Sequence, residues 1–246
     1  MSPKSPAERP PMVVVASTTE DLEDFAPLLA DVAHALGVVS APKLIPREVG
    51  GETAIGTMLA LASAAAGPML VLPVHHEGRG VPERLRRERS AAVRLRRVLV
   101  PSDASEAVAA GTRALYRRLS RAGVQVTMLH VMTEDSTPRI WEGSGHHAAA
   151  WFDEMRRRHG PATSALKVVT GDPWKELHDQ AGEADLVVLF WRHDSRAGHA
   201  AVIRALFAQG IEVPKLLVPL EWIEGGSGAA KVPEGSASGG GATRRG

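Results

Sequence analysis

Short apolar segments alternate with helical patterns through the second half of this chain. The segments are rich in Val and Leu, and they occupy residues 98–101, 124–131, 166–169, 185–191 and 215–218. The continuous apolarity of the fourth segment, 185–191, is typical of a strand that is buried on both faces. Strands that alternate with helices form parallel sheets through right-handed crossovers. The sequence therefore predicts an α/β fold with a doubly wound, parallel five-stranded sheet.

The first half shows the same alternation in a shorter form. The expected elements are a strand at 12–16, a helix from about 20 to 36, a helix from about 53 to 66 and a strand at 69–74. Between the two helices the pattern is weak, although residues 43–45 favour a short strand. We expect a smaller, degenerate α/β half that precedes the complete unit.

Changes in composition indicate where the chain divides. The first residues are rich in Pro, and the last ones are rich in Gly, Ser and Ala, as is typical of flexible segments. The sequence predicts a disordered leader at 1–11, an abbreviated half-domain at 12–75, an Arg-rich connector at 76–96, a complete α/β domain at 97–222 and a flexible tail at 223–246.

The overall composition excludes several classes of protein. With 246 residues, of which 44% are hydrophobic, the chain can bury a substantial core. A net charge of +1 creates no field that demands nucleic acid or a membrane, and the absence of cysteine excludes disulfides and Cys-ligated metals. No apolar run is long enough for a signal peptide or a membrane span. We expect a cytoplasmic protein.

Known catalytic motifs are missing from the sequence. It contains no G-x-S-x-G elbow, no P-loop lysine motif and no H-E-x-x-H helix. The adjacent histidines at 75–76 and 146–147 point apart in a strand and do not share a helical face, so they lack a third metal ligand. The sequence therefore predicts a protein without a metal site that is not an enzyme.

The carboxyl end of segment 98–101 is the first candidate binding site. Pro101 ends the segment because it has no N–H for the ladder, and Asp103 and Ser105 come next, where a helix begins. In an open parallel sheet this end of a strand faces the ligand crevice. Asp103 could recognise a ligand there or simply cap its helix.

The second half resembles the universal stress protein family. The similarity lies in the segments Arg97-Val-Leu-Val-Pro-Ser-Asp-Ala-Ser105, Val126-Thr-Met-Leu-His-Val131, Gly171-Asp-Pro173, Ala184-Asp-Leu-Val-Val188 and Val213-Pro-Lys-Leu-Leu-Val-Pro219. The resemblance implies an adenine-nucleotide-hydrolase-like sheet with strand order 3-2-1-4-5. It also implies a tandem arrangement, with a homodimer or an intramolecular pseudo-dimer formed by last strands that pair. Strand 69–74 would then lie beside strand 215–218, and the pairing residues would be Leu70, Leu72, Leu216 and Val218.

Some members of this family bind ATP, and the sequence keeps only part of that site. The resemblance implies that Pro101, Asp103 and Val131 surround the adenosine. The phosphates would need a loop with two glycines after the fourth strand, followed by a Gly-Ser pair. Here Phe190 and His193 stand at the glycine positions and Ala201-Val202 replace Gly-Ser. We therefore expect no cofactor and no ATP in the usual mode, with ATP or AMP as the lesser alternative.

The loop that replaces the glycines carries its own cations. Arg192, His193 and Arg196 could hold an anion through side chains, together with Ser105 across the crevice. Alternatively, this loop is simply solvated and Trp191 caps the core.

Arginines are concentrated between positions 84 and 97. The segment is either a solvated connecting helix or a docking face for an acidic partner or nucleic acid, with Arg86, Arg87, Arg96 and Arg97 as the candidates. No aromatic residue interleaves with these arginines, which disfavours single-stranded nucleic acid. The sequence thus predicts a regulatory or interaction protein that acts by dimerisation or pseudo-dimerisation and partner docking. The alternative is a small-molecule module that holds a nucleotide or another anion between the first- and fourth-strand loops.

Overall fold

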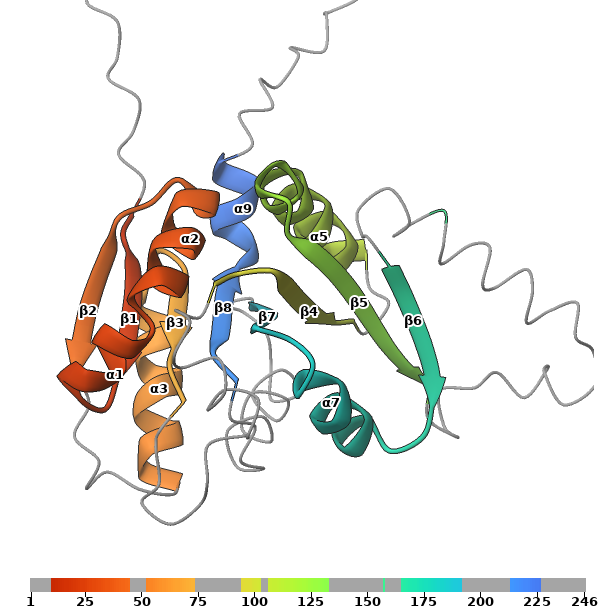
Figure 1. Ribbon diagram of the computed structural model, residues 1–246, viewed down its shortest axis with the longest axis horizontal. Coiled ribbons are helices and arrows are strands. Elements are labelled where there is room, and N and C mark those ends of the chain that lie inside the picture. The colour runs from red at the N-terminus through yellow and green to blue at the C-terminus, as the bar shows by residue number, and fades with distance from the viewer. Residues whose placement is uncertain are drawn as a thin grey trace, which may run out of the picture.

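A computed structural model describes residues 10–44, 52–73, 94–102, 106–132, 157, 165–191 and 213–226. The strands in these ranges form one eight-stranded sheet in the order β2-β1-β3-β8-β7-β4-β5-β6 (Figure 1). Their bounds are β1 (Met12–Ala16), β2 (Ser40–Leu44), β3 (Met69–Val71), β4 (Arg97–Pro101), β5 (Gln125–Met132), β6 (Ala165–Thr170), β7 (Leu186–Trp191) and β8 (Lys215–Pro219). The helices expected near 147–159 and 197–209 lie outside the described residues, except for Arg157.

The second half forms the parallel five-stranded sheet that the sequence predicts. β4 lies between β5 and β7, β6 pairs with β5, and β8 pairs with β7, all in parallel. In chain order these strands are arranged 3-2-1-4-5. Both the fold class and the strand order are confirmed.

The first half contributes three strands and is abbreviated, as expected. β1 pairs in parallel with β2 on one side and directly with β3 on the other. The two halves then join where β3 pairs with β8 in antiparallel orientation, which places Leu70 opposite Leu216. The neighbouring strands implied by the family resemblance are therefore present within one chain. Leu72 lies just after β3 and donates its N–H to the Val15 carbonyl over 2.9 Å.

Helices cover both faces of the sheet. They are α1 (Thr19–Asp24), α2 (Ala26–Leu36), α3 (Glu52–Ala64), α5 (Glu106–Leu119), α7 (Pro173–Ala181) and α9 (Leu220–Gly226), with a 3-10 turn, η1 (Ser120–Ala122), after α5. One core layer packs α2, α5 and α9 against the sheet, and the other packs α3 and α7. Side chains alternate between the layers, so Val98 and Val100 enter the first layer and Leu99 the second.

The single helix expected over residues 20–36 is two helices. Phe25 separates α1 from α2, and Pro27 lies in the first turn of α2. A continuous helix would need Pro27 to donate to the Glu23 carbonyl, which a residue without N–H cannot do. Glycines then end α2 and η1, since Gly37 and Gly123 both adopt the left-handed conformation.

Helix α9 was not expected from the sequence. It begins directly after β8 and continues to Gly226, past the predicted tail boundary at 222. Leu220 and Ile223 are buried, and the helix lies between α2 and α5 (Figure 1). Its last residues are glycines with poor helix propensity, so burial of its apolar side chains stabilises it.

The edge strand β2 contains a proline in a position that a sheet tolerates. Val39 accepts a hydrogen bond from the Met12 N–H over 2.8 Å, so alternate residues from Val39 onward direct their backbone groups to β1. Pro42 therefore directs its nitrogen, which carries no hydrogen, to the open edge. An edge without that donor is a poor template for another strand.

Two carboxylates hold the segment that leads into β4. The Asp185 side chain is buried and accepts hydrogen bonds from the backbone N–H of Arg96 (3.0 Å) and Arg97 (2.7 Å). Asp31 on α2 accepts from the guanidinium of Arg94 (2.8 Å) and from the N–H of Leu95 (3.2 Å). The end of the Arg-rich connector is thus fixed to both halves of the chain.

Replacement of Asp185 tests this arrangement. Asp185→Ala leaves two backbone donors without a charged acceptor, so we expect the free energy of unfolding to fall by about 3 kcal/mol. Asp185→Asn keeps one carbonyl oxygen and should cost about half as much. Urea unfolding measures both values, and Glu183→Ala, an exposed change in the same turn, serves as the control. A decrease of less than about 1 kcal/mol for Asp185→Ala would contradict the role of this carboxylate as a buried hydrogen-bond acceptor.

Candidate functional site

The strand order creates a switch point between β4 and β7. The connection from β4 to β5 runs through α5 on one face, whereas the connection from β6 to β7 runs through α7 on the other. The chain therefore winds in opposite directions from these two neighbouring strands, and ligands of open α/β sheets bind at the carboxyl ends of such strands. The carboxyl ends of β4 and β7 are therefore the candidate site.

The structure places two of the predicted ligand-binding residues at this edge. Pro101 is the last residue of β4 and pairs with Leu129, and Val131 lies near the end of the neighbouring strand β5. Both are half-buried. The other candidates lie outside the described residues, and they are Asp103, Ser105, Arg192, His193 and Arg196.

A buried histidine fixes the peptide that precedes Asp103. The Ser102 N–H donates to the Leu129 carbonyl over 2.8 Å, and Nδ1 of His130 lies 2.9 Å from the Ser102 carbonyl oxygen. Because a carbonyl oxygen only accepts, Nδ1 must carry the hydrogen. His130 is 9% exposed. Sequence reasoning treated it only as part of a strand, although a lone histidine in an apolar strand is the signal that could have singled it out.

Phe190, which the resemblance aligns with a glycine, is part of the hydrophobic core. It lies near the end of β7, is 7% exposed and belongs to the core layer under α5. A methyl group added at Gly111 of α5 would lie 2.8 Å from Cδ1 and Cε1 of the Phe190 ring and 2.9 Å from Leu220. The aromatic ring therefore fits only because the facing helix carries glycine there.

Trp191 packs into the opposite core layer. The side chain is 6% exposed and shares that layer with Trp174 of α7. Within the part of the chain that the structure describes, its indole Nε1 has no hydrogen-bond partner. A buried donor without a partner is unfavourable, so this end of β7 combines a well-packed ring with an unsatisfied polar atom.

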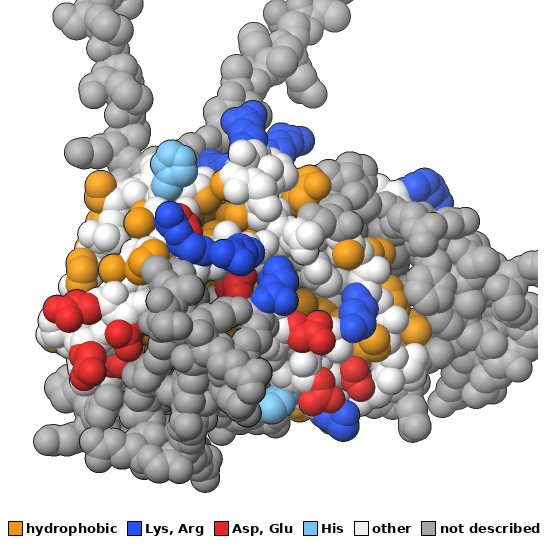
Figure 2. All heavy atoms as spheres, viewed as in Figure 1, with side chains coloured by type: hydrophobic (Ala, Val, Ile, Leu, Met, Phe, Trp, Pro, Cys, Tyr) orange, Lys and Arg blue, Asp and Glu red, His pale blue; other side chains and the backbone are white. Residues whose placement is uncertain are grey.

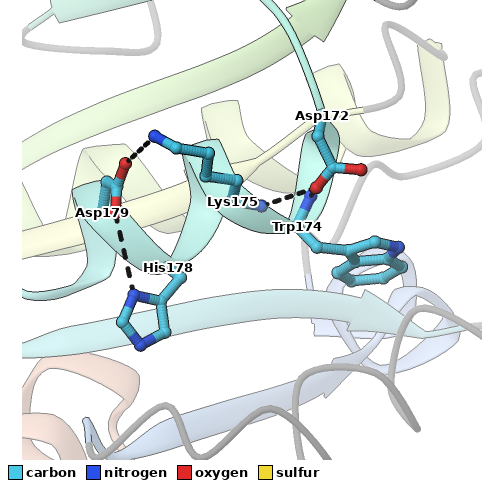
Figure 3. A network of polar contacts seen from close by, with 5 residues as sticks. All are labelled: Asp172, Trp174, Lys175, His178 and Asp179. Carbon is cyan, nitrogen blue, oxygen red and sulfur yellow. Dashed lines mark hydrogen bonds and ion pairs between the residues drawn. The ribbon is translucent and has the colours of Figure 1, made fainter.

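A polar network on α7 stabilises that helix (Figure 3). Asp172 caps it by accepting from the backbone N–H of Trp174 (3.0 Å) and Lys175 (2.8 Å), with Pro173 at the first helical position as expected. Lys175 Nζ donates to Asp179 over 2.7 Å, and His178 Nδ1 lies 3.8 Å from the same carboxylate. The charged side chains of this network are exposed, and their contacts are with one another and with the first turn of the helix.

The charged partners in this network shift each other's pKa. The hydrogen bond from Lys175 lowers the pKa of the Asp179 carboxyl, and the same bond raises the pKa of the Lys175 amine. Among the described residues, no group of three His, Asp or Glu side chains is placed to hold a metal ion.

The predicted partner-binding arginines separate into different environments. The Arg97 guanidinium lies 3.7 Å from the buried Asp185 carboxylate, whereas Arg96 has an exposed side chain. Both lie at the amino end of β4, at the opposite edge of the sheet from Pro101. Arg86 and Arg87 lie outside the described residues.

Several solved structures resemble this chain. A putative universal stress protein from Pseudomonas aeruginosa UCBPP-PA14 matches 87% of the chain and 84% of its own length, with 13% identity and a TM-score of 0.45. A universal stress protein from Archaeoglobus fulgidus DSM 4304 matches 82% of the chain and 77% of its own length, with 15% identity and a TM-score of 0.37. A universal stress protein in complex with cAMP matches 51% of the chain and 98% of its own length, with 16% identity and a TM-score of 0.37.

No family model and no curated protein matches the sequence. Across the described ranges, every helix is too short or too polar to cross a bilayer.

A glycine-to-alanine substitution tests the contact between Phe190 and α5. Gly111→Ala should lower the free energy of unfolding by about 1–2 kcal/mol, because overlap with the ring outweighs the better helix propensity of alanine. In a Phe190→Ala background the same substitution should cost much less. Gly56→Ala on α3 is the matched control, since nothing lies within 4 Å of the added methyl. An equal cost for Gly111→Ala in both backgrounds would argue against the contact.

The exposed pair on α7 predicts a pH-dependent contribution to stability. Because the folded-state pKa of Asp179 is lowered, its contribution is present above the unfolded carboxyl pKa and is lost as the pH falls through the folded value. The difference in Tm between the natural chain and Asp179→Asn should therefore shrink on acidification from about pH 7 to about pH 3. The same difference should also decrease in high salt, since both groups are exposed. A difference that stays constant with pH would show that the ion pair contributes nothing.

Proposed function

We propose that this chain is a universal-stress-protein-like regulatory protein that acts by docking a partner protein and does not bind ATP in the family's usual mode. The strand order of the second half and the quoted sequence segments support the family assignment. The abbreviated first half, joined to it in one sheet, supports a tandem form. Fold alone does not give function, so the proposal depends on the groups that occupy the crevice edge.

The packing of Phe190 is the observation that carries this proposal. A phosphate cradle of the usual kind needs glycines, because the backbone must approach the phosphates closely and use its N–H groups as donors. At the first of these positions the chain has an aromatic ring that is part of the core and is matched to Gly111. This arrangement supports the proposal that the crevice lacks the glycine loop with which a nucleotide site binds phosphates.

The β3–β8 pairing supports an intramolecular pseudo-dimer. The antiparallel pair occupies the edge of β8 that would otherwise be open to a second chain. Helices from both halves meet above it, since Arg118 of α5 donates to the Leu36 carbonyl at the end of α2 over 2.8 Å. The same guanidinium lies 5.4 Å from the ring centroid of Trp222 on α9. A homodimer formed through β8 is the alternative that this pairing disfavours.

A small-molecule binding module is the second candidate function. The observation in its favour is the fixed Ser102 peptide, held by Leu129 and His130 directly before Asp103. A peptide held in this way is preorganised, as groups that border binding sites are. With this function a nucleotide or another anion would lie between Asp103 and the cations Arg192, His193 and Arg196.

Calorimetric titration with ATP, AMP and cAMP distinguishes the two functions. We expect no binding tighter than about 1 mM, because the phosphate donors are missing. Micromolar binding that is abolished by Asp103→Ala and kept by the control Glu23→Ala would overturn the proposal in favour of the usual nucleotide site. Micromolar binding that is instead lost in Arg192→Ser/Arg196→Ser would establish the anion-binding module.

A further inference from the structure

Arginines converge at the amino end of the β4–β5 pair, opposite the crevice. Two groups of them are near each other in space, because the Gln125 N–H at the start of β5 donates to the Arg96 carbonyl over 2.8 Å. The carboxyl end of α5 and the turn η1 lead directly into β5. We name this set the amino-edge patch, and it consists of Arg94, Arg96, Arg97, Arg117, Arg118 and Arg121.

The charges are unevenly distributed over the visible face of the molecule. Figure 2 shows Lys and Arg side chains gathered toward its top and centre, where Figure 1 places the end of α5 and the start of β4. Asp and Glu side chains gather mainly toward the lower left and lower right of the same view. The chain as a whole carries a net charge of only +1, so this edge is a local concentration of positive charge.

Half of the amino-edge patch has structural partners. Arg94 binds Asp31 over 2.8 Å, and the Arg97 guanidinium lies 3.7 Å from Asp185. Arg118 donates to the end of α2 and stacks on Trp222. Arg94 and Arg118 thus join the two halves of the chain, whereas Arg97 binds within the second half, and these interactions account for the presence of all three.

The other half has exposed side chains, for which the described part of the chain supplies no such partner. Among the described residues, no carboxylate forms an ion pair with Arg96, Arg117 or Arg121. Favourable interaction with the helix dipole explains a cation in the last turn of α5, such as Arg117. It does not explain Arg96, whose backbone is held by Asp185 while its side chain remains exposed.

We propose that Arg96, Arg117 and Arg121 bind an acidic segment of a partner protein. This inference rests on the proposed function, since it names the docking face and the chemistry of the segment that docks there. Guanidinium groups bind carboxylates in a bidentate manner, and the backbone that carries Arg96 is already fixed by Asp185. Binding therefore orders side chains only, which limits the entropy lost on association.

A short acidic peptide fits this patch better than nucleic acid does. Three phosphate contacts give a salt dependence with a slope of about −2.7, whereas DNA-binding proteins commonly make about 6–10 such contacts. Single strands also need aromatic side chains on which bases stack. In the described part of the patch the nearby aromatic rings are Trp222, over which the Arg118 guanidinium lies, and Tyr116, which packs against the core.

Fluorescence anisotropy with the full chain and a labelled deca-glutamate peptide tests the proposal. Arg96→Ser/Arg117→Ser/Arg121→Ser should weaken binding about tenfold, as expected for three exposed charge pairs. The matched control is Lys43→Ser/Lys167→Ser/Lys175→Ser, which makes the same change in net charge at exposed sites elsewhere. The control should keep the affinity of the natural chain within about twofold. Thermal melting by circular dichroism confirms that both variants are folded.

Three results would overturn the inference. One is no measurable binding of the peptide by the natural chain, and another is an equal loss of affinity in the two triple variants. The third is tighter binding of a ten-nucleotide single-stranded DNA than of the peptide, which would assign the patch to nucleic acid. Nucleotide affinity at the carboxyl ends of the strands is measured separately by calorimetry and does not depend on any of these results. Failure of the peptide-binding inference is therefore distinguishable from failure of the proposed function.

Discussion

The antiparallel pairing of β3 with β8 makes one sheet out of two groups of parallel strands. Each group alone would leave a buried, apolar strand with unpaired backbone groups at its edge, which is costly or leads to association. Here Leu70 and Leu216 face each other across that junction and are almost completely enclosed. The core layer above them contains residues from both halves, so neither half keeps its packing without the other.

The amino ends and the carboxyl ends of the strands differ in the side chains that surround them. At the carboxyl edge, the ends of β4 and β7 are tightly packed, with Phe190 and Trp191 directed into opposite layers. At the amino edge, buried Asp185 binds backbone donors and leaves arginine side chains exposed. Among the described residues, the carboxyl ends of β4 and β7 are therefore mainly apolar, and the exposed arginines lie at the amino ends of the strands.

Sequence periodicity predicted the strands well because most of them are buried on both faces and read as continuous apolar runs. It could not predict the division of one helix at Phe25, since the apolar spacing continues through Pro27. It also missed α9, whose stability comes from Leu220 and Ile223 packing under neighbouring helices and not from local propensity. The strand order came from the family resemblance, and the contacts of His130 and Gly111 depend on tertiary packing that no local pattern contains.

The fit between Phe190 and Gly111 also couples two positions that lie far apart in the sequence. With Phe190 placed as it is, a methyl group at position 111 would lie 2.8 Å from the ring, so any residue larger than glycine there forces the ring or the helix to shift. Conversely, a glycine at position 190 would leave a cavity the size of the ring beneath α5. A change at either position alone therefore costs packing, and the residues at 111 and 190 are expected to change together.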